Sequence, residues 1–379
     1  MQAGEVELSF LNNFVRELEP YRVASHKAWE QSCSAQVLKL DWNEATVPPS
    51  PRVKAALSEF LEEGCLNWYP DVDNVRLRNK ISDYAGLESA CVEYFAGSDA
   101  VHEVILRSCV KPLDTVAIVS PTYDNFRASA QSEGAKISVY PLDALHNFEF
   151  DIQKFSLYLE QYKPRLVYLC NPNNPTGYLL ANGVIKKLLQ DNPKTLFIVD
   201  EAYYEFSGIT AADLLLTCQN LVVTRTFSKA FGLASFRVGY ILAAPELIEG
   251  FRKIRNPKSI SSTAQIAAEA ALNDIQYLRN YVGEVTKARF DFRLFLEKFG
   301  FHTVGQDNGN FLLVNFGEAR YALIKALESA AIYVRSCDHI KELRGFTRIT
   351  IGTREQMQRV EGVMGAVMSN AQYAKYIHR

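Results

Sequence analysis

The sequence contains no long apolar run, and its first residues do not resemble a signal peptide. Charge of neither sign dominates, because 41 basic residues nearly balance 43 acidic ones and leave a net charge of −2. We therefore expect neither a membrane-spanning chain nor a protein whose partner is a nucleic acid or another polyanion.

Metal-binding and disulfide patterns are also missing. The six histidines are scattered, and the seven cysteines show neither an even count nor paired spacing. We expect reduced thiols, a cytoplasmic location and no metal site. A chain of 379 residues exceeds one typical domain, so two packed domains are expected.

Short apolar segments alternate with helix-length segments through the middle of the chain. The helix-length segments include residues 125–133, which Gly134 closes. This alternation predicts an α/β fold with a mostly parallel sheet covered by helices on both faces. An alanine-rich helix after Ala264 and a charged helical stretch to about Lys298 should lead into a smaller α/β domain. The strand candidates are residues 115–119, 136–140, 165–170, 195–199, 220–224 and 238–243.

One segment combines a strand with side chains that suit a phosphate beside an aldehyde. Residues 221–224 read as a buried strand that opens into a turn carrying two hydroxyls and Lys229, with Arg237 eight residues further on. The hydroxyls and the guanidinium can hold a dianion, while the lysine amine condenses with a carbonyl to form a Schiff base. The segment therefore predicts a pyridoxal phosphate site, although a solvated lysine and arginine at a loop–helix junction remain the alternative. The hydroxyls belong to Thr226 and Ser228.

Two upstream strands end in further polar residues. Residues 171–177 place prolines on either side of asparagines, which fixes a turn after one strand. Another strand runs into Asp200, and a buried carboxylate is costly unless it is paired, for example with a protonated pyridine nitrogen. Tyr203 and Asn174 could both reach the ring oxygen of the cofactor. Each cluster has an ordinary alternative, a plain loop or a helix N-cap, but ligands bind at such strand ends.

Together these segments resemble the fold-type I pyridoxal phosphate-dependent aminotransferases, specifically the histidinol-phosphate aminotransferase branch. The resemblance extends from about Pro20 to Thr353. It implies that Lys229 carries the cofactor and moves the proton, that Asp200 pairs with the pyridinium, and that Tyr203 and Asn174 bind the ring oxygen. It also implies that Tyr123 stacks on the cofactor ring. The phosphate ligands that it implies are Thr226, Ser228, Arg237 and the backbone amides of Ser98 and Asp99 at a helix N-terminus.

The same resemblance implies substrate residues and a homodimer. Arg348 would clamp a carboxylate through its planar fork, and Arg335 would face the distal anion of the substrate, unless both are exposed arginines on edge strands. Tyr21 would touch the substrate phosphate, Asn43 would lie in the lid, and Tyr69 would reach the phosphate site of the neighbouring subunit.

The expected domains are a large cofactor-binding domain of residues 46–272 and a small domain of residues 1–45 and 273–379 that includes an N-terminal substrate lid. Two departures from the family pattern lie in this lid. Residues 23–26, which include His26, replace a Pro-Gly element, and Ala45 replaces the second asparagine of an Asn-Glu-Asn-Pro element. Both changes bear on the substrate rather than on the cofactor.

The expected function is a pyridoxal phosphate-dependent aminotransferase that works by a ping-pong mechanism. It would move an amino group from an amino acid, with glutamate as the expected donor, to a small carbonyl compound that carries a phosphate or another anion. One rival within the fold is a phosphoamino acid decarboxylase similar to threonine-phosphate decarboxylase. A rival of another class is a protein that binds the cofactor without catalysis.

Overall fold

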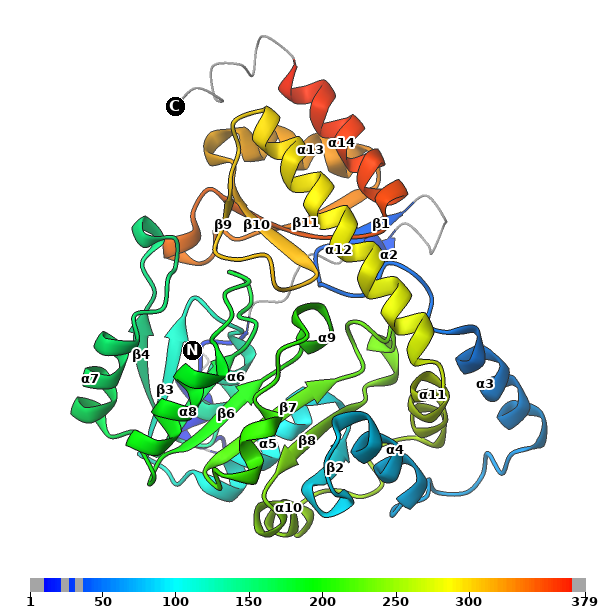
Figure 1. The fold of residues 1–379 in the computed structure, drawn as a ribbon, viewed down its shortest axis with the longest axis vertical. Coiled ribbons are helices and arrows are strands. Elements are labelled where there is room, and N and C mark those ends of the chain that lie inside the picture. The colour runs from blue at the N-terminus through cyan, green and yellow to red at the C-terminus, as the bar shows by residue number, and fades with distance from the viewer. Residues whose placement is uncertain (1–9, 22–26, 31–36, 370–379) are drawn as a thin grey trace, which may run out of the picture.

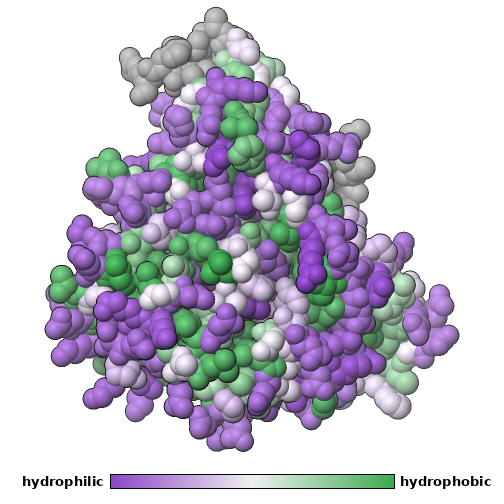
Figure 2. All heavy atoms as spheres, viewed as in Figure 1, coloured by the Kyte–Doolittle hydropathy of each residue, from purple (hydrophilic) through white to green (hydrophobic). Residues whose placement is uncertain are grey.

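The computed structural model describes residues 10–21, 27–30 and 37–369, and it has two parts that are each built on one β-sheet (Figure 1). The predicted lid residues 23–26 and Cys33 lie outside these ranges. Within the same ranges, no helix is both long enough and apolar enough to cross a membrane. Figure 2 shows hydrophilic residues over most of the visible face, interrupted by hydrophobic patches on the lower, larger part.

The larger part contains a seven-stranded sheet in the order β2-β8-β7-β6-β5-β3-β4. Strands β3 to β7 pair in parallel, whereas β8 runs antiparallel to both β7 and β2. Every predicted strand overlaps an observed one, so the mostly parallel sheet is confirmed. The strands are β2 (Val92–Phe95), β3 (Thr115–Ser120), β4 (Lys136–Pro141), β5 (Leu166–Cys170), β6 (Leu196–Asp200), β7 (Leu221–Thr226) and β8 (Gly239–Ala243).

Both faces of this sheet are buried. Alternate residues of β5 enter two different hydrophobic clusters, with Val167 and Leu169 in one and Leu166 and Tyr168 in the other. This is why the strand appears in the sequence as a continuous apolar run rather than as an alternating one. Helices supply the other side of each cluster: α3 (Pro51–Glu63), α4 (Val75–Ala85), α5 (Gly97–Cys109), α6 (Asn125–Ser132), α7 (Ile152–Tyr162), α8 (Asn182–Asp191), α9 (Tyr204–Ser207), α10 (Pro245–Arg252) and α11 (Ser262–Leu272).

The smaller part contains a five-stranded sheet in the order β1-β11-β12-β10-β9. The 24-residue helix α12 (Ile275–Lys298) leads into it, and with α13 (Arg320–Ser329) and α14 (Arg354–Met368) it covers one face of the sheet (Figure 1). Two short helices near the N-terminus are α1 (Asn13–Arg16) and α2 (Lys27–Glu30). The strands are β1 (Leu38–Leu40), β9 (Thr303–Val304), β10 (Phe311–Asn315), β11 (Ile332–Ser336) and β12 (Phe346–Thr350).

The N-terminal strand β1 pairs in parallel with β11, so both ends of the chain contribute to the small sheet. This arrangement accords with the expected division of the chain into a large domain of residues 46–272 and a small domain made of the remaining residues. The domain boundaries themselves remain a proposal. Strands β11 and β12 lie in the interior of the sheet. The alternative that Arg335 and Arg348 sit on edge strands is therefore wrong.

Three cations share the face of the small sheet that lies opposite helices α12, α13 and α14. Lys39 is in register with Tyr333, two residues before Arg335, and Arg335 is in register with Arg348. Residues in register on paired strands, and residues two apart on one strand, point to the same side of a sheet. The neighbouring side chains Leu38 and Ile349 point the other way, into the hydrophobic core. We call Lys39, Arg335 and Arg348 the cation face.

Candidate active site

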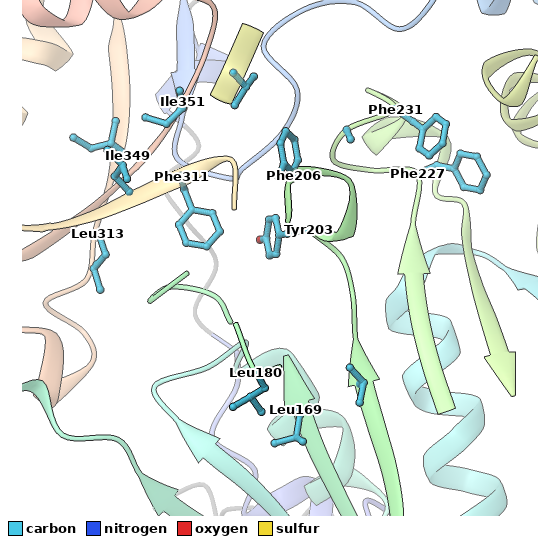
Figure 3. Close-up of a cluster of buried hydrophobic side chains, with 14 of the residues drawn as sticks. Leu169, Leu180, Tyr203, Phe206, Phe227, Phe231, Phe311, Leu313, Ile349 and Ile351 are labelled. Carbon is cyan, nitrogen blue, oxygen red and sulfur yellow. The ribbon is translucent and has the colours of Figure 1, made fainter. Parts of the chain in front are cut away.

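The carboxyl ends of the parallel strands meet the small sheet at one place. Tyr203, which follows β6, and Phe311, at the start of β10, have ring centroids 5.0 Å apart with the planes inclined at 76° (Figure 3). In sheets of this type, ligands bind outside the carboxyl ends of the strands. The predicted strand-end clusters and the cation face therefore border the same region.

Lys229 lies in the turn after β7, and its amine contacts the segment that follows β1. Its Nζ donates a hydrogen bond of 2.9 Å to the carbonyl oxygen of Trp42. Burial, reinforced by the positive charge of Arg348, lowers the pKa of Lys229 from 10.5 to about 8. A substantial fraction of the amine is therefore neutral near physiological pH, which is the form that can attack a carbonyl or accept a proton.

Asp200 is the last residue of β6, and its carboxylate is buried. Oδ2 accepts a hydrogen bond of 2.7 Å from the hydroxyl of Tyr168 and lies 3.4 Å from Nε2 of His102. Oδ1 accepts the backbone N–H of Ala202 at 3.2 Å. The N-cap position of the following helix, α9, is occupied by Tyr203, so the alternative that Asp200 is a helix N-cap is wrong.

A compact anion cradle forms where α5 begins. Gly97 has φ +87°, and a Cβ there would lie 2.5 Å from Nη2 of Arg237. The Ser228 hydroxyl accepts from Thr226 at 2.9 Å and from Nη1 of Arg237 at 3.2 Å. Backbone N–H groups at a helix start, two hydroxyls and a guanidinium are the donors that a phosphate dianion needs. The cradle also contains Ser98 as the second residue of α5.

The side chain of Asp99 ties the cradle to the predicted stacking aromatic. Its Oδ1 accepts from the hydroxyl of Tyr123 at 2.9 Å and from Asn125 at 3.1 Å, and its Oδ2 accepts from Arg237 at 3.1 Å. The sequence pattern assigned only the backbone amide of Asp99 to the site. The ring of Tyr21 lies 6.1 Å from that of Tyr123, centroid to centroid, so the two predicted residues are brought together.

Arg348 and Asn43 join the small sheet to the strand ends. Arg348 donates through Nη1 to Oδ1 of Asn174 at 2.7 Å, and among the described residues its Nε has no hydrogen-bond partner. Asn43 adopts φ +57° and donates through Nδ2 to the hydroxyl of Tyr203 at 2.9 Å. The backbone N–H of Asn43 donates to Thr350 of β12 at 3.0 Å. The four predicted residues therefore form two hydrogen-bonded pairs, and strand β12, which carries both Arg348 and Thr350, brings the pairs together.

The two remaining predicted residues are placed differently. Arg335 lies beside Arg348 on the cation face, where burial, together with the charge of Arg348, lowers its pKa. Tyr69 lies in the loop between α3 and α4 and is 79% exposed, with Nζ of Lys258 4.9 Å from the centroid of its ring. The structure therefore presents Tyr69 to the outside of this chain.

Sequence reasoning missed several side chains that contribute to the site. Lys39 pairs with Glu44 and lies 3.1 Å from Asp41, and these charges flank the segment that carries Asn43. The spacing of Lys39 and Asp41 was a usable signal, because residues two apart on a strand lie on the same face. His102 and Tyr168 gave no signal, because one occupies a helix and the other an apolar strand.

These groups fit pyridoxal phosphate. An amine of lowered pKa, a buried carboxylate, an aromatic ring and an anion cradle converge on one region, and they are the partners of its aldehyde, ring nitrogen, ring face and phosphate. A metal centre has no such support: no group of three or more potential metal ligands occurs in the described part of the chain.

Comparisons with known proteins agree on the family of this chain. Residues 35–362 match the family model described as aminotransferase class I and II. The chain is 45% identical to dihydroxyacetone phosphate transaminase of Campylobacter jejuni, over 92% of this chain and 95% of that protein. It is 32% identical to a histidinol-phosphate aminotransferase of Ruminiclostridium cellulolyticum, over 90% and 96%.

The fold is also shared with a solved structure. A histidinol-phosphate aminotransferase from Sinorhizobium meliloti, crystallised with pyridoxal-5'-phosphate, superposes with a TM-score of 0.84 at 24% identity, covering 96% of this chain and 98% of that one. The predicted fold type and the predicted aminotransferase activity of the histidinol-phosphate aminotransferase type are confirmed. The chain belongs to the class I and II aminotransferase family.

Proposed function

We propose that this aminotransferase binds pyridoxal phosphate where the strand ends of its large sheet meet the small sheet, and that it aminates a small, phosphorylated carbonyl compound. One observation carries the proposal: two separate groups of anion-binding side chains border this region. The cradle around Ser228 and Arg237 suits the phosphate of the cofactor. Arg335 and Arg348 of the cation face then remain for an anionic substrate, because Lys39 is paired with Glu44 and Asp41.

Each residue has a distinct role in this proposal. The bound cofactor supplies an aldehyde and a ring that withdraws electrons from the carbon that loses its proton. Lys229 would hold the aldehyde group and, once displaced by the donor amine, would carry the α-proton of the donor on Nζ to the carbon that the lysine had held. Asp200 would hold the ring nitrogen in its protonated form, and Tyr123 would cover the ring. Tyr203 and Asn174 would donate to the ring oxygen, and Arg348 would bind the carboxylate of the amino acid.

The nature of the acceptor rests on the relative from Campylobacter jejuni, whose name specifies dihydroxyacetone phosphate. A phosphorylated ketone has an anion for Arg335 and lacks the imidazole ring of histidinol phosphate. We therefore propose a phosphorylated ketone as the acceptor and glutamate as the donor. The replacement at Ala45, next to the lid residues Asn43 and Glu44, accords with a substrate other than histidinol phosphate.

A spectral half-reaction screen tests this proposal. The holoprotein is mixed with glutamate, then the aminated protein is mixed with ketones with and without a phosphate ester, and the absorbance of the bound cofactor is followed. We expect glutamate to convert the cofactor and only phosphorylated ketones to restore it. Rapid restoration by unphosphorylated ketones would contradict the substrate assignment. Release of carbon dioxide from phosphothreonine without a keto acid would favour the decarboxylase instead.

We also propose a homodimer. The described surface around α3 and the loop after it exposes a group of large apolar side chains, and such a patch on a protein surface marks an interaction site. A second copy of the chain would bury this patch and bring Tyr69 to the phosphate cradle of its neighbour. The apolar side chains are Leu61, Leu66, Trp68, Tyr69, Val72 and Val75.

We also propose a cytoplasmic location, on the cysteine pattern of the sequence.

A further inference from the structure

Two polar side chains that contact Asp200 are not among the predicted cofactor ligands, and the proposed mechanism does not use them. Tyr168, in the middle of β5, and His102, in the second turn of α5, are 0% and 1% exposed. Most polar groups that are buried so completely have hydrogen-bond partners. The oxygen that both approach is Oδ2 of Asp200, at 2.7 Å from the Tyr168 hydroxyl and 3.4 Å from Nε2 of His102.

The Tyr168 hydroxyl is a donor to this carboxylate. Burial raises the pKa of Tyr168 well above its usual value, and the charge of Asp200 raises it further, so the hydroxyl keeps its proton. Aromatic packing fixes the geometry: the ring stacks on Phe126 with centroids 4.0 Å apart and planes 9° apart. Tyr168 can therefore neither ionise nor turn away from Asp200.

The same aromatic stack fixes His102. Its ring stands at 85° to both Phe126 and Tyr168, with centroids 5.4 and 5.5 Å away. Nε2 faces Oδ2 of Asp200 and, also at 3.4 Å, the hydroxyl oxygen of Thr224, whereas Nδ1 has no hydrogen-bond partner among the described residues. The tautomer with the proton on Nε2 is favoured, because it directs the N–H toward oxygen atoms and leaves no buried N–H without an acceptor.

The Asp200 carboxylate keeps one acceptor site free of these contacts. A carboxylate oxygen has two lone pairs. Tyr168 occupies one of the two lone pairs of Oδ2, with Nε2 of His102 3.4 Å from the same oxygen, and the N–H of Ala202 occupies one of Oδ1. One lone pair of Oδ1 remains for a further donor.

We infer that Tyr168 and His102 are positioning residues that hold the Asp200 carboxylate in one orientation, so that it stays directed at the ring nitrogen of the cofactor and keeps that nitrogen protonated. This inference rests on the proposed pairing of Asp200 with that nitrogen. The Tyr168 hydrogen bond and the nearby His102 ring fix the position of Oδ2. Without them the carboxylate could turn away from the ring nitrogen, the nitrogen would hold its proton less tightly, and the ring would withdraw electrons less effectively.

The test uses holoprotein reconstituted with cofactor labelled with ¹⁵N at the ring nitrogen. Tyr168→Phe removes only the hydroxyl and keeps the aromatic stack. We expect its ¹⁵N resonance to move toward that of a neutral pyridine, and the half-reaction with glutamate to slow about tenfold, the effect of one lost hydrogen bond to a charged group. His102→Leu should shift the resonance in the same direction, and His102→Asn, which keeps an N–H donor, should shift it less.

Tyr94→Phe is the matched control. Tyr94 is another fully buried strand tyrosine, but it lies in β2 and its ring contacts Arg255. This variant should keep the wild-type resonance. Thermal melting of each variant without cofactor shows whether the fold is retained.

Two outcomes separate this inference from the proposed function. If Asp200→Ala loses the pyridinium resonance while Tyr168→Phe and both His102 variants keep it, the positioning role is overturned and the proposed function stands. If Asp200→Ala itself keeps the wild-type resonance, the pairing of Asp200 with the cofactor is wrong, and the inference fails with it.

Discussion

At the scale of single residues, the lowered pKa of Lys229 predicts a pH dependence that can be measured without substrate. Only the neutral amine attacks the aldehyde, so the rate at which cofactor-free protein captures pyridoxal phosphate should rise with pH. Its midpoint should lie near the pKa of about 8 rather than near the usual 10.5. Stopped-flow absorbance measures this rate. A profile that is still rising steeply above pH 9.5 would contradict the environment described here.

Replacement of Arg348 tests how its positive charge affects the pKa of Lys229. Arg348→Leu removes a positive neighbour of Lys229, so the capture midpoint should move to higher pH. The same variant should raise the KM for the amino donor by about 10- to 100-fold, the range for a lost hydrogen bond to a charged group. Initial rates at varied glutamate measure the second effect. An unchanged KM would assign the donor carboxylate to another residue.

Lys229→Ala should reduce transamination by at least about a thousandfold, since it removes both the covalent attachment and the base. Steady-state rates and the absorbance of added cofactor check the expectation together. A variant that retains wild-type turnover would exclude Lys229 from the chemistry.

At the scale of structural elements, the start of α5 predicts a sharp difference between two glycines. Gly97→Ala would force a side chain into φ +87° and against Arg237. Such strain costs about 1–3 kcal/mol, so the dissociation constant of the cofactor should rise about tenfold or more. Gly283→Ala, in the middle of α12 with open space around it, should leave cofactor binding unchanged and stabilise the fold by about 0.5–1 kcal/mol. Equal cofactor affinity of the two variants would contradict the proposed cradle.

Some strands could be predicted from the sequence and others could not, because different interactions stabilise them. Residues 166–170 and 196–200 are continuous apolar runs because helices bury both faces, and such runs are visible in the sequence. Strand β1 is three residues long and exists through its pairing with β11, almost 300 residues away. No local pattern encodes such a pairing. The same holds for His102, whose partner Asp200 is on another element.

At the scale of the whole molecule, the proposed dimer predicts complementation between two inactive variants. In a mixed dimer of Lys229→Ala and Tyr69→Ala chains, one site would combine an intact Lys229 with the partner subunit's Tyr69. Half of the dimers in an equimolar refolded mixture would be mixed, so activity should recover to about a quarter of wild type. Activity equal to the sum of the separate variants would show that Tyr69 does not act across an interface.

The parallel pairing of β1 with β11 also affects how the chain is made. All strands of the large sheet lie between residues 92 and 243, so that sheet can form while the ribosome is still adding the remaining third of the chain. Residues 38–40, although made early, have no partner strand until residues 332–334 emerge. The cradle can therefore form before the cation face, and a nascent chain could hold its cofactor before it can recognise a substrate.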